Sequence, residues 1–352
     1  MATAHAALRT RLCDLVGIDA PIVQTGMGWV ATPPLVAASS NAGALGILAA
    51  ATMTFDEMTA AITQIKARTS KPFGVNLRSD APDAKERVQH LIDAGVRVAS
   101  FAQAPKQDLI KMLKDSGRVV IPSIGAKRHA EKVAAWGVDA VLVQGHEAGG
   151  HVGQIATTVL LPQIVDAVDI PVIAAGGFFD GRGLVAALAY GAEGIAMGTR
   201  FLLTSDSTVP QHIKQRYLEI GNTVVTTKVD GVPHRVLTTE LINKLESATV
   251  ATSLPKAVGN ALKFKKLTGT GFSAMLKEGL AMRKSQGLTF SQMLQAANTP
   301  MLLKLSMVDG NAEAGVMAGG QVVGVISDLP SCAELVERIM AEAGRTLDRL
   351  GV

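Results

Sequence analysis

The 352-residue sequence predicts a (β/α)8 TIM barrel with a smaller, mainly helical second domain over the barrel mouth. Short apolar, β-branched runs alternate with segments of helical period, which is the pattern that parallel βαβ units produce. An open doubly wound sheet is the alternative, but no GxGxxG motif follows the first run. Eight strands are predicted before residue 205, at 21–27, 45–51, 73–78, 97–103, 119–125, 140–144, 171–178 and 194–202.

The helical segments between these runs include 55–68, 83–94, 106–116, 127–136, 159–168 and 181–190. Glycines near their C-caps are expected to end several of them, at Gly95, Gly117, Gly137 and Gly191. After residue 202 the alternation stops. Runs at 224–229 and 235–237 flank a turn-forming Asp230-Gly231 pair, which predicts a β-hairpin.

The rest of the chain divides into three parts. Residues 240–305 are mostly of helical pattern and basic, and residues 306–329 are a glycine-rich return segment. Residues 332–350 form an amphipathic pattern that predicts a final helix packed on the barrel. We therefore expect a barrel of residues 1–210 completed by 315–352, and a helical substrate domain of residues 211–314.

Composition excludes several classes of protein. A net charge of +4 with 18% charged residues is too mild for a nucleic-acid ligand. Cys13 and Cys332 have no partners at metal-binding spacing, so neither a disulfide framework nor a metal site is predicted. No continuous apolar run has the length of a signal peptide or a membrane span, so we expect a soluble cytoplasmic protein with a small-molecule substrate.

The loop at 144–151, which follows the sixth predicted strand, is expected to carry the chemistry. Gly149 and Gly150 allow the backbone to approach a ligand closely, because they lack a Cβ. His151 is the candidate acid or base, since imidazole titrates near neutral pH. His146 is a candidate substrate contact. A flexible turn with an exposed histidine is the structural alternative.

The carboxyl ends of the strands of a TIM barrel meet at the ligand site, and here those ends are rich in glycine and amides. Gly176-Gly177 and Gly198-Thr199 follow the seventh and eighth strands, where barrels often hold phosphate. Tight turns are the alternative role for these glycines. The amides of Asn76 and Gln144 both donate and accept, as a flavin ring requires. Gly26 and Met27 would leave room for a flat ring and cover it.

Five motifs spread over nearly the whole chain match a known pattern: PIVQTGM at 21–27, GVN at 74–76, QGHEAGGH at 144–151, AGGF at 175–178 and MGTRF at 197–201. They resemble the nitronate monooxygenase (2-nitropropane dioxygenase-like) family of FMN proteins. That family also includes flavin-dependent enoyl-acyl-carrier reductases and NADH:quinone reductases. The resemblance implies a TIM barrel that binds FMN non-covalently beneath a helical substrate domain.

Site residues follow from the resemblance. It implies that His151 is the acid or base beside the flavin N5 and that FMN contacts Asn76, Gln144, Gly149, Gly177, Gly198 and Thr199. Some bacterial members have lysine at the position of Ser123 and aspartate at that of Gln144, so the contacts on that side differ here. The complete predicted cofactor set adds Gly26, Met27, Ser123, Gly150 and Gly176.

Four further runs, at 24–30, 122–125, 201–210 and 297–304, carry a narrower resemblance. They are similar to the actinobacterial flavin dehydrogenases of steroid C/D-ring breakdown, which implies oxidation of a hydroxylated indanone-carboxyl-CoA. The basic excess between residues 240 and 284 fits the phosphates of CoA, although a solvated helix face is the alternative. The candidate CoA contacts are Lys263, Lys265 and Lys266.

Several reactions stay open at His151. In the leading hypothesis, an acyl-CoA dehydrogenase, His151 takes a proton from a substrate carbon or hydroxyl while hydride passes to the flavin. The alternatives are a nitronate monooxygenase that uses O2, an enoyl-thioester or quinone reductase with NAD(P)H as co-substrate, and a flavin-binding protein without turnover. The sequence leaves the electron acceptor, the stereochemistry and the oligomeric state, including a homodimer, open.

Overall fold

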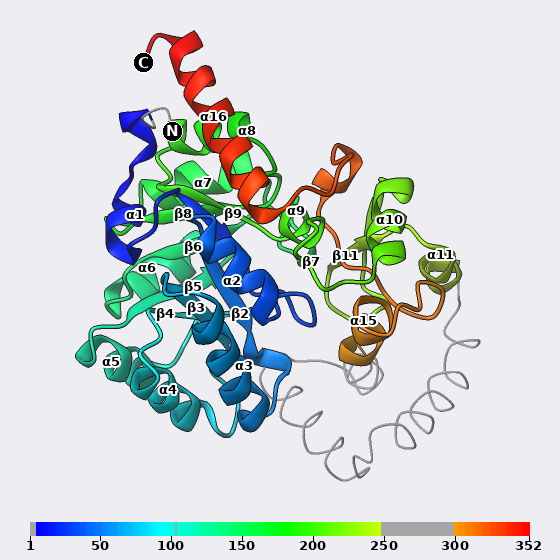
Figure 1. Cartoon of the computed structure of the whole chain (residues 1–352), viewed down its shortest axis with the longest axis horizontal. Coiled ribbons are helices and arrows are strands. Elements are labelled where there is room, and N and C mark those ends of the chain that lie inside the picture. Colours follow the sequence, from blue (N-terminus) through cyan, green and yellow to red (C-terminus); the bar gives the residue numbers. More distant parts are fainter. Residues whose placement is uncertain (1–4, 103, 248–298) are drawn as a thin grey trace.

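A computed structural model describes residues 5–102, 104–247 and 299–352. Eight parallel strands close into a barrel in their sequence order, which confirms the predicted fold class (Figure 1). The barrel strands are β1 (Ile22–Gln24), β2 (Leu45–Ala49), β3 (Phe73–Leu77), β4 (Val98–Phe101), β5 (Val119–Ile124), β6 (Val141–Gln144), β8 (Val172–Ala175) and β9 (Gly194–Met197).

Helices connect consecutive strands and cover the outside of the barrel (Figure 1). They are α2 (Pro33–Asn41), α3 (Phe55–Arg68), α4 (Ala84–Asp93), α5 (Gln107–Asp115), α6 (Lys127–Ala135), α7 (Thr157–Val165) and α8 (Gly181–Ala189). The glycines predicted after four of these helices all have positive φ, as helix-ending glycines do. Further elements are η1 (Ala6–Leu8), α1 (Arg11–Val16), η2 (Ala50–Thr52) and η3 (Gln321–Gly324).

Each observed strand lies within its predicted range, and the last one differs most. The prediction extended that strand over 194–202, but β9 ends at Met197 and α9 (Thr199–Leu202) follows it. Helical hydrogen bonds replace the ladder at this point, because Leu202 N donates to Gly198 O at 2.9 Å and Leu203 N to Thr199 O at 3.0 Å. The chain therefore turns at the barrel rim, which places Thr199 at the start of a helix.

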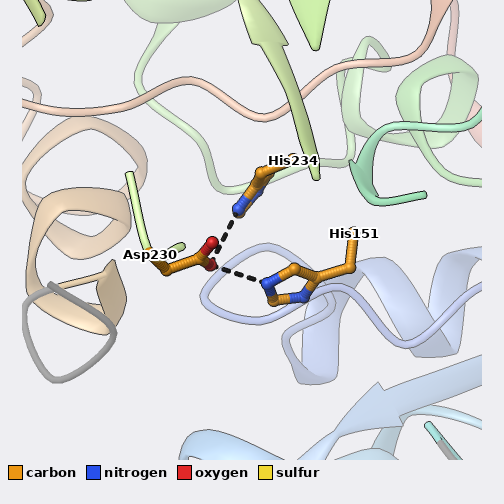
Figure 2. A group of neighbouring side chains, drawn as sticks. All are labelled: His151, Asp230 and His234. Atoms are coloured by element: carbon orange, nitrogen blue, oxygen red, sulfur yellow. Dashed lines mark hydrogen bonds and ion pairs between the residues drawn. The ribbon is translucent and has the colours of Figure 1, made fainter. Parts of the chain in front are cut away.

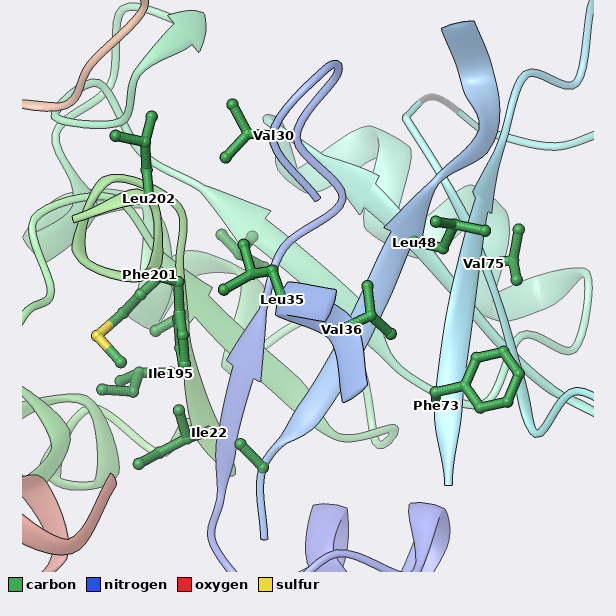
Figure 3. Close-up of a cluster of buried hydrophobic side chains, with 14 of the residues drawn as sticks. Ile22, Val30, Leu35, Val36, Leu48, Phe73, Val75, Ile195, Phe201 and Leu202 are labelled. Atoms are coloured by element: carbon green, nitrogen blue, oxygen red, sulfur yellow. The ribbon is translucent and has the colours of Figure 1, made fainter. Parts of the chain in front are cut away.

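Two apolar layers form the core. Outward-facing strand side chains such as Ile22 pack against side chains of the surrounding helices, among them Leu35 of α2 and Phe201 of α9 (Figure 3). Inward-facing side chains such as Ile47, Leu142 and Ile173 fill the barrel interior, and side chains of α1 join this second cluster. The alternation of the two faces along each strand explains why the strands read as continuous apolar runs.

The final helix, α16 (Cys332–Leu350), has the bounds that the sequence predicted and packs against α8 and α2 (Figure 1). A capping box begins it, because Ser331 accepts from Glu334 N and the Glu334 carboxylate accepts from Ser331 N. Leu335, Val336 and Ile339 are buried. Helix α16 lies between α8 and α2, the place of the eighth helix in a (β/α)8 barrel.

Gly181 makes the close contact between α8 and α16 possible. A Cβ at this position would lie 2.4 Å from the backbone nitrogen of Ala343 and 2.5 Å from the carbonyl oxygen of Ile339. We expect Gly181→Ala to destabilise the protein by about 1–3 kcal/mol, measured by thermal or denaturant unfolding, since the two helices must separate. Gly344→Ala on α16 is the matched control, because a Cβ there meets no atom within 4 Å. Equal stabilities would contradict this packing.

A second group of elements lies on one side of the barrel (Figure 1). It contains α10 (Gln211–Ile220), β10 (Thr223–Thr226), β11 (His234–Leu237), α11 (Glu240–Ser247) and α15 (Thr299–Met307). The predicted hairpin is confirmed, since β10 and β11 pair antiparallel, but its connection covers 227–233 rather than a four-residue turn. The boundaries of the helical domain stay a prediction.

A two-residue strand, β7 (Gly150–His151), was not predicted from the sequence. It pairs antiparallel with β11 and so adds the glycine-rich loop after β6 to the hairpin sheet. Lys263, Lys265 and Lys266 lie outside the described residues. Within the described ranges, no helix is both long and apolar enough to cross a membrane.

Candidate active site

A cavity of about 560 Å³ opens at the carboxyl ends of the barrel strands. This volume is in the range of small-molecule and cofactor sites. His151 and all eleven predicted cofactor residues line it, namely Gly26, Met27, Asn76, Ser123, Gln144, Gly149, Gly150, Gly176, Gly177, Gly198 and Thr199. His146 is not among the lining residues, and its Nδ1 lies 2.7 Å from the carbonyl oxygen of Gly153. The structure therefore does not bring His146 to the cavity.

Gly176 and Gly177, in the loop after β8, have the backbone conformation that glycine favours. Their φ angles are +98° and +87°, in the left-handed region. A Cβ at Gly176 would also lie 3.1 Å from Ala148 N and 3.2 Å from Gly145 O, so a larger residue would push the loops after β6 and β8 apart. These glycines keep the backbone of the rim close-packed and exposed toward the cavity.

Glu147 anchors its own loop. Its carboxylate accepts hydrogen bonds from Thr157 N at 3.0 Å and from Thr157 Oγ1 at 2.7 Å. The Thr157 hydroxyl also lies 3.0 Å from Gly176 O. Thr157 thus connects the loops after β6 and β8 on the rim of the cavity.

We expect Thr157→Val to weaken the binding of added flavin by roughly tenfold, because it removes the hydroxyl that lies between the Glu147 carboxylate and Gly176 O in the two glycine-rich loops. Equilibrium dialysis or fluorescence quenching of the flavin measures this affinity. Thr63→Val is the matched control, since its exposed hydroxyl bonds only within α3. An unchanged flavin affinity in Thr157→Val would show that the connection between the loops is dispensable.

The return segment crosses the rim and completes it. Gly320 N donates to the Thr199 hydroxyl at 2.9 Å, and Gln321 N donates to Glu147 O at 2.9 Å. Gly149 packs so closely on Gly319 that a Cβ at Gly149 would lie 2.6 Å from the Gly319 carbonyl carbon. The return segment therefore links the loops after β6 and β9, and Gly320 lines the cavity with them.

The side-chain amides of Gln144 and Asn76 have different hydrogen-bond partners within the protein. Gln144 Nε2 donates to the carbonyl oxygen of His151 at 2.6 Å, so this amide orients the end of the loop. Asn76 is 8% exposed and its Nδ2 lies 3.4 Å from Ser100 Oγ. Both side chains border the cavity, and each has a carbonyl oxygen available as an acceptor.

His151, Asp230 and His234 form a hydrogen-bonded trio at the cavity (Figure 2). Asp230 Oδ2 lies 2.6 Å from His151 Nε2 and 3.2 Å from His234 Nδ1. Asp230 Oδ1 accepts from Val232 N at 3.1 Å, which fixes the orientation of the carboxylate. The side chains of Asp230 and His234 are buried, whereas 59% of the His151 side chain is exposed.

The ionisation state of Asp230 determines which nitrogens of His151 and His234 carry hydrogen. Burial raises the pKa of its carboxyl, but the hydrogen bonds from His151 and His234 outweigh burial and hold the pKa well below its ordinary value. An ionised carboxylate only accepts, so the nitrogens that face it, His151 Nε2 and His234 Nδ1, carry hydrogen. The other nitrogen of His151, Nδ1, is left to accept a proton.

Pairing between β7 and β11 brings the trio together. The antiparallel register places His151 opposite His234, and their ring centroids lie 4.6 Å apart. Asp230 comes from the hairpin connection that precedes β11. From the sequence, Asp230 is expected only in the turn of the hairpin. The spacing of four residues between Asp230 and His234 is the one feature of the sequence that could have indicated a contact between these two side chains.

The same three residues have metal-ligand types, although no metal was predicted. Their candidate ligand atoms all lie within 4.8 Å of one another. In the present arrangement both imidazoles direct N–H groups at the carboxylate, and a metal would have to displace those hydrogens. The observed geometry is therefore that of a hydrogen-bonded trio.

Trp29 contributes an unusual backbone to the cavity wall. Its φ of +65° is the one positive value among the non-glycine residues that the structure describes. Such strained conformations cluster at ligand sites. The indole Nε1 is buried and has no hydrogen-bond partner among the residues that the structure describes. Lys304 Nζ lies 6.0 Å from the centre of the indole ring.

A closed parallel barrel with glycine-rich loops and a hydrogen-bonded His–Asp–His trio at one end defines a TIM-barrel enzyme with its ligand at the strand ends. The chain belongs to the nitronate monooxygenase family, whose model matches residues 9–92 and 83–342. This result confirms the family that the five motifs indicated. The enzyme is an oxidoreductase.

Among curated proteins, the chain is 64% identical over 341 residues to the (3aS,4S,5R,7aS)-5-hydroxy-7a-methyl-1-oxo-octahydro-1H-indene-4-carboxyl-CoA dehydrogenase of Mycobacterium tuberculosis, with 96% of each chain covered. It is 61% identical over 346 residues to the dehydrogenase of the same name from Rhodococcus jostii, with 98% of each covered. Among solved structures, FabK from Thermotoga maritima has a TM-score of 0.79 at 34% identity, covering 97% of this chain and 98% of that one.

Proposed function

We propose that the protein is an FMN-dependent dehydrogenase of a hydroxylated, steroid-derived acyl-CoA, with His151 as the acid or base. The observation that carries this proposal is the 64% identity over 96% of the chain to a dehydrogenase named for a hydroxylated indene-carboxyl-CoA. The predicted proton-transfer residue and all predicted cofactor residues line a single cavity, which supports the assignment of the chemistry to this site.

The residues at the cavity fit FMN. The rim consists of glycines from the loops after β6, β8 and β9, of which Gly150, Gly176 and Gly177 have positive φ. Backbone groups without side chains at such positions suit a phosphate and a flat ring. Trp29 Nε1 borders the cavity as a buried group that has no hydrogen-bond partner among the described residues, so it can bind a ligand. When bound, the flavin supplies the hydride acceptor.

His151 performs the proton transfer in this proposal. Its Nδ1 accepts a proton from the substrate, because Nε2 donates to Asp230. Asp230 is ionised and lies 2.6 Å away, so it stabilises the imidazolium that forms. Gln144 holds the backbone carbonyl of His151 and keeps the loop in place. The apolar lining around the trio, including Val232, Leu303 and Met307, limits the access of water.

We infer that the basic segment of the helical domain contacts the phosphates of CoA. Lys263, Lys265 and Lys266 are the proposed contacts, on the basis of the charge of the sequence between residues 240 and 284. The proposal also includes a cytoplasmic location and NAD(P) as a possible co-substrate.

Oxidation of alkyl nitronates with O2 is the second candidate, because the matching family model is that of nitronate monooxygenase. The same His151 Nδ1 would serve this reaction. The two relatives above 60% identity, both named as acyl-CoA dehydrogenases, favour the acyl-CoA. A reductase that uses NAD(P)H is the remaining alternative.

An anaerobic titration of the FMN-loaded protein tests the proposal. A hydroxyacyl-CoA, an alkyl nitronate and NADH are added separately while the visible absorbance of the flavin is followed. We expect bleaching by the hydroxyacyl-CoA in the absence of any other reductant. Bleaching by the nitronate or by NADH alone would replace the proposal with the corresponding alternative. A protein that binds no added FMN would overturn the cofactor assignment as well.

A further inference from the structure

His234 has a buried nitrogen that nothing in the proposed reaction uses. Only 3% of its side chain is exposed, and the ring borders the cavity. Nδ1 lies 3.2 Å from Asp230 Oδ2, whereas Nε2 has no hydrogen-bond partner among the residues that the structure describes. A buried polar group without a partner is costly, so such groups usually mark the place of a ligand atom.

The character of Nε2 follows from its neighbours. Asp230 is ionised and can only accept, so the ring nitrogen that faces it carries the hydrogen. In a neutral imidazole the opposite nitrogen then holds a lone pair and accepts. His234 Nε2 therefore suits a hydrogen-bond donor in the cavity. A thioester carbonyl offers no donor, but a hydroxyl does.

We propose that His234 Nε2 accepts a hydrogen bond from the hydroxyl of the substrate and selects hydroxylated acyl-CoA esters over esters that lack this group. The inference rests on the proposed function, because it takes the acyl-CoA as the substrate of this cavity. His234 binds the substrate, and the shared carboxylate of Asp230 positions both histidines. His151 Nδ1 remains free to move the proton.

Distances within the site agree with this division of roles. The two imidazole centres lie 4.6 Å apart, so one substrate can contact both rings at the same time. In the compound named for the two dehydrogenase relatives, the 5-hydroxyl is on the ring carbon adjacent to the 4-carboxyl-CoA carbon. A hydroxyl bound at His234 therefore brings the neighbouring carbons near His151.

Two variants separate the functions of the two ring nitrogens. In His234→Asn the amide nitrogen can take the place of Nδ1 and donate to Asp230, but no atom takes the place of Nε2. In His234→Gln the longer amide can reach the place of Nε2 and contact the hydroxyl, while the donor to Asp230 is lost. The pair thus tests the substrate contact apart from the support of Asp230.

The measurement is isothermal titration of each FMN-loaded protein with a hydroxyacyl-CoA and with the same acyl-CoA lacking the hydroxyl. We expect the wild type to prefer the hydroxylated ester by about tenfold or more, since the analogue leaves Nε2 without a partner. His234→Asn should bind both esters equally, and His234→Gln should retain a preference. FMN affinity should stay unchanged in the Asn variant.

Three results would overturn the inference: a wild type that does not discriminate, an Asn variant that keeps the full preference, or an Asn variant with weakened FMN affinity, which would make the flavin the partner of Nε2. The wild-type comparison needs no variant, so a folding defect in either one leaves the inference testable. If the hydroxyacyl-CoA is bound with the expected preference but never bleaches the flavin, the proposed function fails and the specificity contact stands.

Discussion

Replacing His151 with alanine is expected to slow the reduction of bound flavin by the substrate by about 10²–10⁴-fold, the usual contribution of a positioned general base. Flavin binding should persist, because the predicted contacts of the cofactor on the rim are mostly glycine backbone, and His151 is joined to the rest of the site through Asp230. Anaerobic stopped-flow absorbance separates the two effects, since it follows reduction of the flavin after saturation with substrate.

His129→Ala is the control for this experiment. His129 is an exposed histidine on α6, outside the lining of the cavity, so its loss should leave the reduction rate unchanged. A wild-type rate in His151→Ala would show that another group moves the proton. His234 would then be the next candidate, since it contacts the same carboxylate.

Replacing Asp230 with asparagine is expected to lower the rate of flavin reduction by about 10²-fold or more, although the side chain hardly changes in size. The amide carries no charge, so it cannot stabilise the imidazolium of His151. It can also present its NH2 group to His151 Nε2, which would move the imidazole hydrogen to Nδ1 and block the base. The pH dependence of the reduction rate should change together with its magnitude, whereas a purely structural defect would lower flavin affinity instead.

A double variant tests whether the two residues act as one unit. Because Asp230 works through His151 in this mechanism, the variant with both replacements should be about as slow as His151→Ala alone. Additive losses would show that Asp230 contributes by a separate route, for example through His234.

Stability in acid provides an independent readout of the Asp230 contacts. The folded-state pKa of this buried carboxyl is lowered, so the trio stabilises the fold at pH values above the ordinary pKa of aspartate, about 3.9. This contribution is lost as the pH falls through the folded-state pKa. Denaturant unfolding as a function of pH should therefore show a smaller loss of stability below about pH 4 in Asp230→Asn than in the wild type.

Local sequence patterns were sufficient for much of the fold. Apolar runs separated by helical segments predicted all eight barrel strands. Amphipathic periodicity predicted both the first and the last residue of α16. The predicted end of a strand was less accurate where the strand leads directly into a helix, as at Gly198. The apolar run 194–202 is compatible with either a strand or a helix. The predicted cofactor residues were found because all of them lie at or just after strand ends, which the barrel topology gathers at one rim.

Local patterns say nothing about pairing between distant segments, and the trio depends on such a pairing. His151 and Asp230 are 79 positions apart in the sequence, and β7 is too short to have a period of its own. His146, three residues after the end of β6's apolar run, was predicted to contact the substrate, yet its ring bonds to Gly153 O instead. Only the backbone conformation of the loop distinguishes the two histidines.

The sequence by itself determined the barrel and the glycine-rich ends of its strands, because both depend on short-range periodicity and on where the strands end. The tertiary structure decided which nitrogen of His151 is free, which carboxylate orients it and that His234 has an unused acceptor. Those properties arise where β7 joins β11, through hydrogen bonds between residues far apart in the chain.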